Sequence, residues 1–231
     1  ADPRRVVLVD EGGTLEVRGV VFTGGYSTGG GGGGGGVLVQ AGGTLRLLNG
    51  SGVRGCVVNR SGAAQAQGGG VFNTGGTLEM EGAALTDNVA EAAQGQASGG
   101  GLFNHPEAIA YLASILVENN TARTASETLL AAGGGLINLG DLTMRDARIV
   151  GNLVQAAGGQ ANGGGLQTSG PAYLVSIFVE NNTARTASAT AMASGGGVVE
   201  AAEGAAASDE AASDAAAGAD IAAAARLHQW R

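Results

Sequence analysis

The most constraining feature of the chain is a glycine triplet followed by an apolar residue, which recurs at intervals of 30 to 34 residues. The copies begin at Gly34, Gly68, Gly99, Gly133, Gly163 and Gly195. A period of this length is typical of solenoids, in which each repeat packs only against its neighbours. We therefore expect one elongated repeat domain rather than a globular one.

A second motif, an apolar residue followed three positions later by Asn, keeps the same period. It begins at Cys56, Leu85, Leu116, Ile149 and Phe178 and ends at Asn59, Asn88, Asn119, Asn152 and Asn181. Stacked asparagines can hydrogen-bond to one another and to the turn backbone. We expect these five asparagines to form a structural ladder and the five apolar residues to form an inward column. In that column, Cys56 is interpreted as a small buried hydrophobe.

A third segment alternates apolar and polar residues, as a half-buried strand does. It is clearest at 12–17, 42–47 and 75–80. The chain is therefore expected to be all-β, a right-handed parallel β-helix of about six coils of ~30 residues with three short strands per coil. Ala/Gly-rich loops are expected at one edge, for example at 89–98 and 153–162. The segment 114–126 nearly repeats at 176–188, which indicates duplication of a two-coil unit.

Composition indicates a thin core and distinguishes a repeat domain from an Ala-rich C-terminal segment. There are 45 glycines and only 3% aromatic residues, too few large side chains to fill a thick globular core. The repeat domain is expected at 6–199. Residues 200–231 are rich in Ala and break the rhythm, so they are expected to form a partly helical cap or, alternatively, a disordered linker.

Charge and hydropathy exclude two classes of partner. The net charge is −8 and the basic residues are dispersed arginines, which does not suit nucleic-acid binding. No apolar run reaches the length of a transmembrane span, and no signal peptide is visible. A single cysteine excludes an internal disulfide framework.

Candidate chemistry is sparse. Asp87 and Glu118 precede the expected ladder one coil apart, which makes them weak candidates for a shared Ca²⁺ site; the alternative is solvated turn carboxylates. Two tyrosines, Tyr111 and Tyr173, would support carbohydrate binding if exposed. They are instead expected in the core, at the place of Met80 and Met144. No catalytic residue and no other cofactor site is predicted.

Four N-glycosylation sequons begin at Asn49, Asn59, Asn119 and Asn181. Three of these asparagines belong to the expected ladder, where a glycan would not fit. Asn49 is therefore the candidate acceptor, on condition that a eukaryote secretes the chain.

The paired motifs, here Gly-Gly-Gly-Val/Leu and apolar-x-x-Asn, resemble the Gly-Gly-Ala-Ile/Leu/Val and Phe-x-x-Asn repeats of chlamydial polymorphic outer membrane proteins. The resemblance covers roughly residues 6–199. That family is similar to the pectin-lyase-like β-helices and acts in surface adhesion. This sequence departs from it by having Gly in place of Ala in the triplet.

Together these observations predict a structural or adhesive, non-catalytic surface repeat module, either alone or as a subunit of a larger assembly. Its expected partner is another protein, or further copies of itself, contacted through a flat β-helix face. The alternative is a β-helix that binds or cleaves polysaccharide. The resemblance implies an extracellular or cell-surface location.

Overall fold

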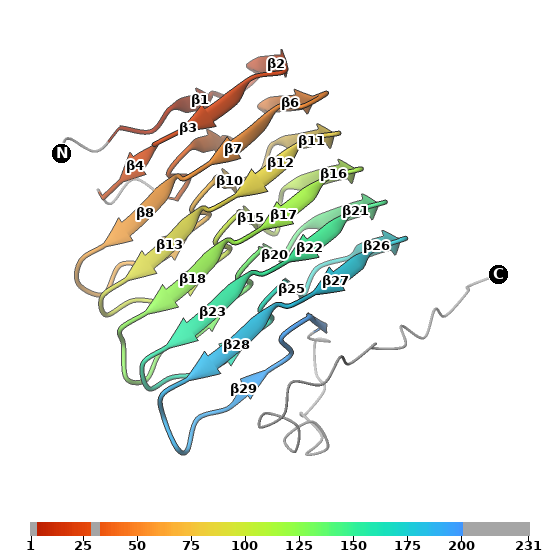
Figure 1. Cartoon of the computed structure of the whole chain (residues 1–231). Helices are drawn as coiled ribbons and strands as arrows, with labels where there is room; N and C mark the ends of the chain where they lie inside the picture. Colours follow the sequence, from red (N-terminus) through yellow and green to blue (C-terminus); the bar gives the residue numbers. More distant parts are fainter. Residues whose placement is uncertain (1–3, 29–32, 201–231) are drawn as a thin grey trace.

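A computed structural model describes residues 4–28 and 33–200 as a parallel β-solenoid of about six coils (Figure 1). Each strand pairs in parallel with its equivalent in the next coil, never with the strand that follows it in sequence within this part of the chain. In the first sheet the register advances by 30 to 34 residues per coil. The fold class and period expected from the repeats are confirmed.

Each complete coil contains five strands rather than the expected three, and we number the five sheets I to V in chain order. Sheet I contains β1 Val7–Val9, β5 Val37–Val39, β10 Val71–Asn73, β15 Leu102–Asn104, β20 Leu136–Asn138, β25 Leu166–Thr168 and β30 Val198–Glu200. Sheet II contains β2 Thr14–Arg18, β6 Thr44–Leu48, β11 Thr77–Glu81, β16 Ile109–Ala113, β21 Asp141–Arg145 and β26 Ala172–Val175. Sheet III contains β3 Val21–Thr23, β7 Gly52–Arg54, β12 Ala84–Thr86, β17 Leu116–Glu118, β22 Arg148–Val150 and β27 Phe178–Glu180.

The two additional sheets occupy segments that we expected to be loops. Sheet IV contains β4 Tyr26–Ser27, β8 Val57–Arg60, β13 Val89–Ala92, β18 Thr121–Thr124, β23 Leu153–Ala156 and β28 Thr183–Thr186. Sheet V contains β9 Ala66–Gln67, β14 Ala97–Ser98, β19 Ala131–Ala132, β24 Ala161–Asn162 and β29 Ala193–Ser194. We expected loops at 89–98 and 153–162 because Ala has a low β-propensity, and that expectation was wrong. Pairing with equivalent strands above and below outweighs that local preference.

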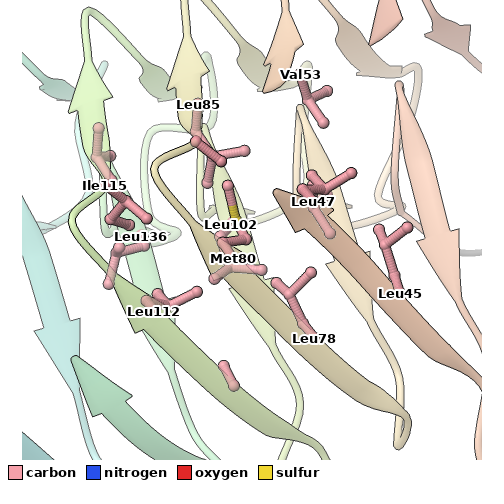
Figure 2. Packing of buried hydrophobic residues seen from close by; sticks show 14 of the residues in the cluster. Leu45, Leu47, Val53, Leu78, Met80, Leu85, Leu102, Leu112, Ile115 and Leu136 are labelled. Atoms are coloured by element: carbon pink, nitrogen blue, oxygen red, sulfur yellow. The ribbon is translucent and has the colours of Figure 1, made fainter. Parts of the chain in front are cut away.

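Sheets I, II and III enclose the main core. Their inward residues repeat from coil to coil, as in the column Leu47–Met80–Leu112–Met144 of sheet II, and Figure 2 shows several such neighbours stacked together. Side chains of this size contribute about 1.5–3 kcal/mol each when fully buried. Because every coil presents the same apolar positions, this cluster is continuous through the stack.

Sheets IV and V enclose a second, thinner lobe. Its core consists almost entirely of alanine: Ala66, Ala90, Ala92, Ala97, Ala122, Ala131, Ala156 and Ala161 join Val58 and Val154. Such small side chains let two backbones approach closely while leaving little empty space. The alanine content of the repeats therefore reflects a second packed layer rather than flexible loops.

The glycine triplets form the waist between the two lobes. A Cβ on Gly69 would lie 2.4 Å from the backbone of Val89, across the coil, and one on Gly70 would lie 2.9 Å from the Asn88 side chain. Distances this short leave no room for a side chain. The first glycine of this triplet, Gly68, has a φ of 59°, which favours glycine as well. Opposite walls of the coil thus meet backbone to backbone at the triplet.

An asparagine ladder lines the other side of the waist. Its members are Asn88, Asn120, Asn152 and Asn182, linked by amide–amide hydrogen bonds of 2.8–3.0 Å. Each Oδ1 from Asn120 onward also accepts the backbone N–H of the preceding member, and each Nδ2 donates to a carbonyl of sheet III. The first three members are buried, and these bonds satisfy amides that would otherwise be costly to bury.

The predicted ladder was correct for Asn88 and Asn152 and wrong for Asn59, Asn119 and Asn181. Asn119 and Asn181 are exposed turn residues with φ of 55° and 54°, while the asparagine after each one points inward. Asn59 lies on β8, where its Nδ2 is 3.3 Å from Glu91 Oε2. Each Asn-Asn doublet is compatible with two registers that differ by one residue, and we chose the first asparagine. A shift of one residue reverses which side chain faces the core.

The same slip affected the predicted inward column. The structure aligns Val53, Leu85, Val117, Ile149 and Val179. Leu85 and Ile149 were therefore correct, whereas Leu116 is only partly buried and Phe178 is 49% exposed. Cys56 is buried as expected, but it belongs to the asparagine column.

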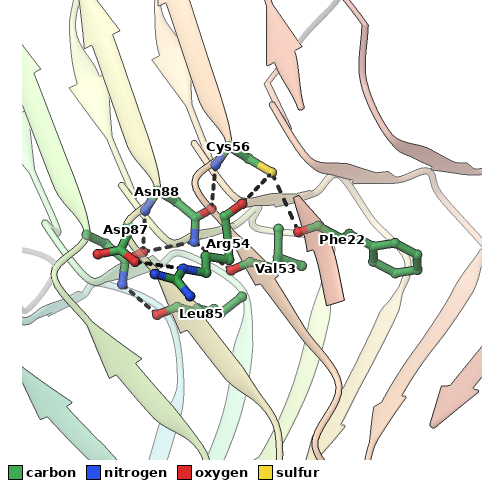
Figure 3. A network of polar contacts seen from close by, with 8 residues as sticks. Phe22, Val53, Arg54, Cys56, Leu85, Asp87 and Asn88 are labelled. Carbon is green, nitrogen blue, oxygen red and sulfur yellow. Dashed lines mark hydrogen bonds and ion pairs between the residues drawn. The ribbon is translucent and has the colours of Figure 1, made fainter. Parts of the chain in front are cut away.

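Cys56 occupies the ladder position one coil before Asn88 (Figure 3). Its Sγ accepts the N–H of Gly25 at 3.3 Å, as an Asn Oδ1 does in later coils. Its thiol also lies 3.9 Å from the carbonyl oxygen of Phe22, the position that ladder amides reach in sheet III, and 3.4 Å from the carbonyl oxygen of Arg54. Burial raises the pKa of this thiol, and hydrogen bonds with the backbone of Gly25, Arg54 and Gly24 only partly oppose that effect.

A second asparagine ladder was not predicted. Asn73, Asn104 and Asn138 end successive strands of sheet I and are linked at 3.0 and 2.9 Å, with Thr168 Oγ1 as the acceptor in the next coil. Their Nδ2 atoms also bond to backbone carbonyls at the corner leading to sheet II. The sequence signal was present, because each asparagine lies two residues after the apolar residue that follows a glycine triplet.

The proposed division between residues 199 and 200 stays a prediction. The predicted cap or linker at 200–231 falls, apart from Glu200, outside the described residues.

Candidate functional site: the tyrosine face

Sheet II turns a flat face outward, and its composition changes along the solenoid. Alternation along each strand directs Leu and Met inward and leaves three outward columns. The middle column reads Glu16, Arg46, Glu79, Tyr111, Thr143 and Tyr173. The first three coils therefore present charged side chains, and the last three present two tyrosines.

The charged half is paired with itself. Arg46 lies 3.6 Å from Glu16 and 2.9 Å from Glu79, and Arg18 lies 2.8 Å from Glu16. The hydrogen bond from Arg18, aided by Arg46, lowers the pKa of the Glu16 carboxyl. Because these groups are exposed, the pairs contribute little to stability. These ion pairs nevertheless leave no unpaired charged side chain in the middle column of the first three coils.

We call the outward side of β16, β21 and β26 the tyrosine face. Tyr111 is 50% exposed and Tyr173 is 66% exposed. The expectation that both lie in the core was wrong. Register pairs Tyr111 with Glu79, whereas Met80 pairs with Leu112 and Met144 with Leu174. A displacement of one residue separates the outward tyrosine from the inward column.

The two tyrosines flank a shorter residue. Thr143 pairs with Tyr111 on one side and with Tyr173 on the other. The surface is hollowed on both sides of this column. One hollow is lined by Tyr111, Thr143 and Tyr173 together with Ile109, Asp141 and Pro171. The other extends from Tyr111 and Thr143 toward Glu81, Ala113 and Arg145.

Polar groups along β21 are available to a ligand. The side chains of Asp141, Thr143 and Arg145 make no hydrogen bond or ion pair with the rest of the described chain. They alternate with the inward residues Leu142 and Met144, so all three lie on the tyrosine face. The face therefore combines aromatic surface with a carboxylate, a hydroxyl and a guanidinium.

Asp87 and Glu118 lie in adjacent coils, where the backbone N–H of Asp87 donates to the carbonyl oxygen of Glu118 at 3.1 Å. Asp87 is an exposed turn residue with a φ of 57°, and its Oδ2 lies 3.1 Å from Arg54 Nε. Glu118 pairs with Thr86 rather than with Asp87. Among residues 4–28 and 33–200, no group of three or more His, Cys, Asp or Glu side chains is arranged to hold a metal ion. Calcium binding by this pair stays a prediction.

The sequon asparagines are distributed differently from our expectation. Asn49 lies exposed in the turn between β6 and β7 with a φ of 47°. Asn119 and Asn181 are exposed too, so burial in a ladder no longer argues against them as acceptors. Glycosylation at Asn49 stays a prediction.

Comparisons with known proteins return nothing: no family model, no curated protein and no solved structure matches the chain. Its strand pairing and its stacked asparagines define the chain as a parallel β-solenoid with two asparagine ladders. No helix in the described ranges is long and apolar enough to cross a membrane.

Proposed function

We propose that this chain is a structural or adhesive repeat module without catalytic activity, which contacts its partner through the tyrosine face. The observation that carries the proposal is the exposure of Tyr111 and Tyr173 on one flat sheet, beside polar side chains that have no partner among residues 4–28 and 33–200. Aromatic side chains, tyrosine among them, are enriched on surfaces where proteins bind partners.

The motif resemblance to the polymorphic outer membrane proteins, and through them to pectin-lyase-like β-helices, supports the adhesive role. An extracellular or cell-surface location is part of the same proposal. Self-association through this face is the other arrangement that a flat sheet permits. Light scattering would detect it as a mass above that of the monomer, and the Tyr111→Ala/Tyr173→Ala variant would return the monomer mass.

Polysaccharide binding is a second candidate, and the exposed tyrosines favour it. The faces of sugar rings are apolar while their edges carry hydroxyls, so an aromatic side chain flanked by hydrogen-bonding groups suits them. Asp141, Thr143 and Arg145 supply such groups around the tyrosine column.

The experiment is a binding assay with the purified chain on a panel of immobilised polysaccharides, run beside a cleavage assay on the same polymers. We expect retention that is lost in Tyr111→Ala/Tyr173→Ala and no release of reducing ends. A matched control is Phe178→Ala, which removes an exposed aromatic residue from sheet III. Cleavage of a polyuronate that disappears in Asp87→Asn or Glu118→Gln would overturn the non-catalytic proposal.

A further inference from the structure

We infer that the tyrosine face binds an extended glycan chain joined through equatorial glycosidic bonds, lying along the solenoid axis with alternate sugar rings on Tyr111 and Tyr173. This inference rests on the polysaccharide binding proposed above and specifies the shape of the polymer and its direction on the surface.

The spacing of the tyrosines is the first argument. They lie in one column two coils apart, which corresponds to about 9.6 Å along the axis. Two sugar residues of an extended, equatorially linked chain advance by a similar length. In such a chain successive rings are turned over, so every second ring presents the same face. Tyr111 and Tyr173 would each receive an equivalent ring face.

The residue between the tyrosines fits the same register. The intervening sugar would lie over Thr143, where a short side chain leaves room for a ring of the opposite orientation. A tyrosine in every coil would match a period half as long. The spacing follows from the two-coil duplication, because positions 111 and 173 are equivalent in the two copies.

The flanking groups supply hydrogen bonds on both edges of the chain. Asp141 lies on one side of the tyrosine column and Arg145 on the other, each two residues from Thr143, or about 6.6 Å along the strand. Their side chains have no partner within the described residues, and together with the Thr143 hydroxyl they offer both donors and acceptors. Glycan hydroxyls, which both donate and accept, complement such a mixed set.

The shape of the surface argues for a polymer rather than a small molecule or a protein side chain. The hollows beside the column are lined by residues of three and of four successive coils, and they border a flat sheet instead of an enclosed pocket. Small-molecule sites enclose most of their ligand, and protein hot spots are desolvated pockets. An open track along the axis suits a chain that extends beyond both tyrosines.

The test is titration calorimetry of the purified chain with cellohexaose, an extended glycan of this linkage, and with maltohexaose, whose axial bonds impose a coiled shape. We expect binding of cellohexaose and at least tenfold weaker binding of maltohexaose. Tyr111→Ala and Tyr173→Ala should each weaken cellohexaose binding roughly tenfold, corresponding to about 1.4 kcal/mol of stacking energy. Phe178→Ala should leave it unchanged.

A spacing variant tests whether binding depends on the distance between the two tyrosines or only on their presence. Thr143→Tyr combined with Tyr173→Thr keeps two exposed tyrosines but moves them into adjacent coils, about 4.8 Å apart. We expect it to bind cellohexaose as weakly as Tyr173→Ala, with unchanged thermal unfolding.

Three results would overturn the inference: no binding of cellohexaose, equal binding of maltohexaose, or full affinity in the spacing variant. The polysaccharide binding proposed above would fail differently, if no polysaccharide of the panel were retained through these tyrosines. The non-catalytic proposal would fail if the chain cleaved one.

Discussion

Asn88 Oδ1 accepts a hydrogen bond from the backbone N–H of Cys56 at 3.0 Å, and the Cys56 thiol holds the equivalent ladder position one coil earlier (Figure 3). The ladder thus begins with sulfur. The thiol accepts from Gly25 and lies near the Phe22 carbonyl, which reproduces the amide's two contacts with the backbone, but not the amide–amide bond, with weaker hydrogen-bonding groups.

The identity of the ladder residues can be tested at a doublet. Asn120→Ala should destabilise the protein by about 3 kcal/mol or more, because it leaves the backbone and side-chain N–H groups of Asn88 and the carbonyl of Leu85 unsatisfied in the interior. Asn119→Gly, at the exposed neighbouring position, should cost a few tenths of a kcal/mol. Denaturant unfolding of both variants measures the difference. A larger loss from Asn119→Gly would restore the original register.

Extension of the ladder is a second prediction. Cys56→Asn should maintain or raise the free energy of unfolding, since an amide can bond to Gly25, Phe22 and Asn88 as its counterparts do. Cys56→Ala should lower it by about 1–2 kcal/mol, because the Gly25 N–H loses its buried acceptor. Thermal unfolding would rank the two variants, and equal melting temperatures would contradict this account of the thiol.

The raised pKa of Cys56 predicts a dependence on alkaline pH. The folded state retains the thiol proton at pH values where the unfolded chain has lost it, so this contribution to stability is complete below the unfolded pKa and decreases as pH rises through the folded pKa. Alkylation of the native protein at neutral pH should be slow and should become fast in denaturant. In Cys56→Ala the decrease attributable to this group should vanish.

The waist predicts an unusual sensitivity at glycine. Gly69→Ala should cost about 3 kcal/mol or more, because its Cβ would lie 2.4 Å from backbone atoms of Val89 and Gly100. Gly62→Ala is the control. That residue has a φ of 72° but nothing within 4 Å of a Cβ, so only backbone strain of about 1 kcal/mol is expected. Similar unfolding midpoints for the two variants would disprove close contact at the waist.

The alanine lobe should resist enlargement. Ala122→Leu places three extra carbons between sheets IV and V, and we expect a loss of about 2–3 kcal/mol. Ala125→Leu, in the exposed segment after β18, should change stability by less than about 0.5 kcal/mol. If both variants were equally stable, the lobe would have to be a loosely packed loop region, as the sequence first suggested.

The sequence by itself determined the solenoid, its period and its coil number. The glycine triplets and the asparagines recur at positions that only stacked coils make equivalent, and that signal does not depend on the details of any one coil. The alternating segments of sheet II were also legible, because five residues suffice to display a period of two.

Tertiary structure decided which of two adjacent residues faces inward. At Asn119–Asn120 and Asn181–Asn182 both members are chemically suited to the ladder, and only pairing with the neighbouring coil selects the second. The same choice turned Tyr111 and Tyr173 outward and so produced the candidate binding face. Sheets IV and V likewise depend on partners: their strands are only two to four residues long, and they form because equivalent strands lie above and below them.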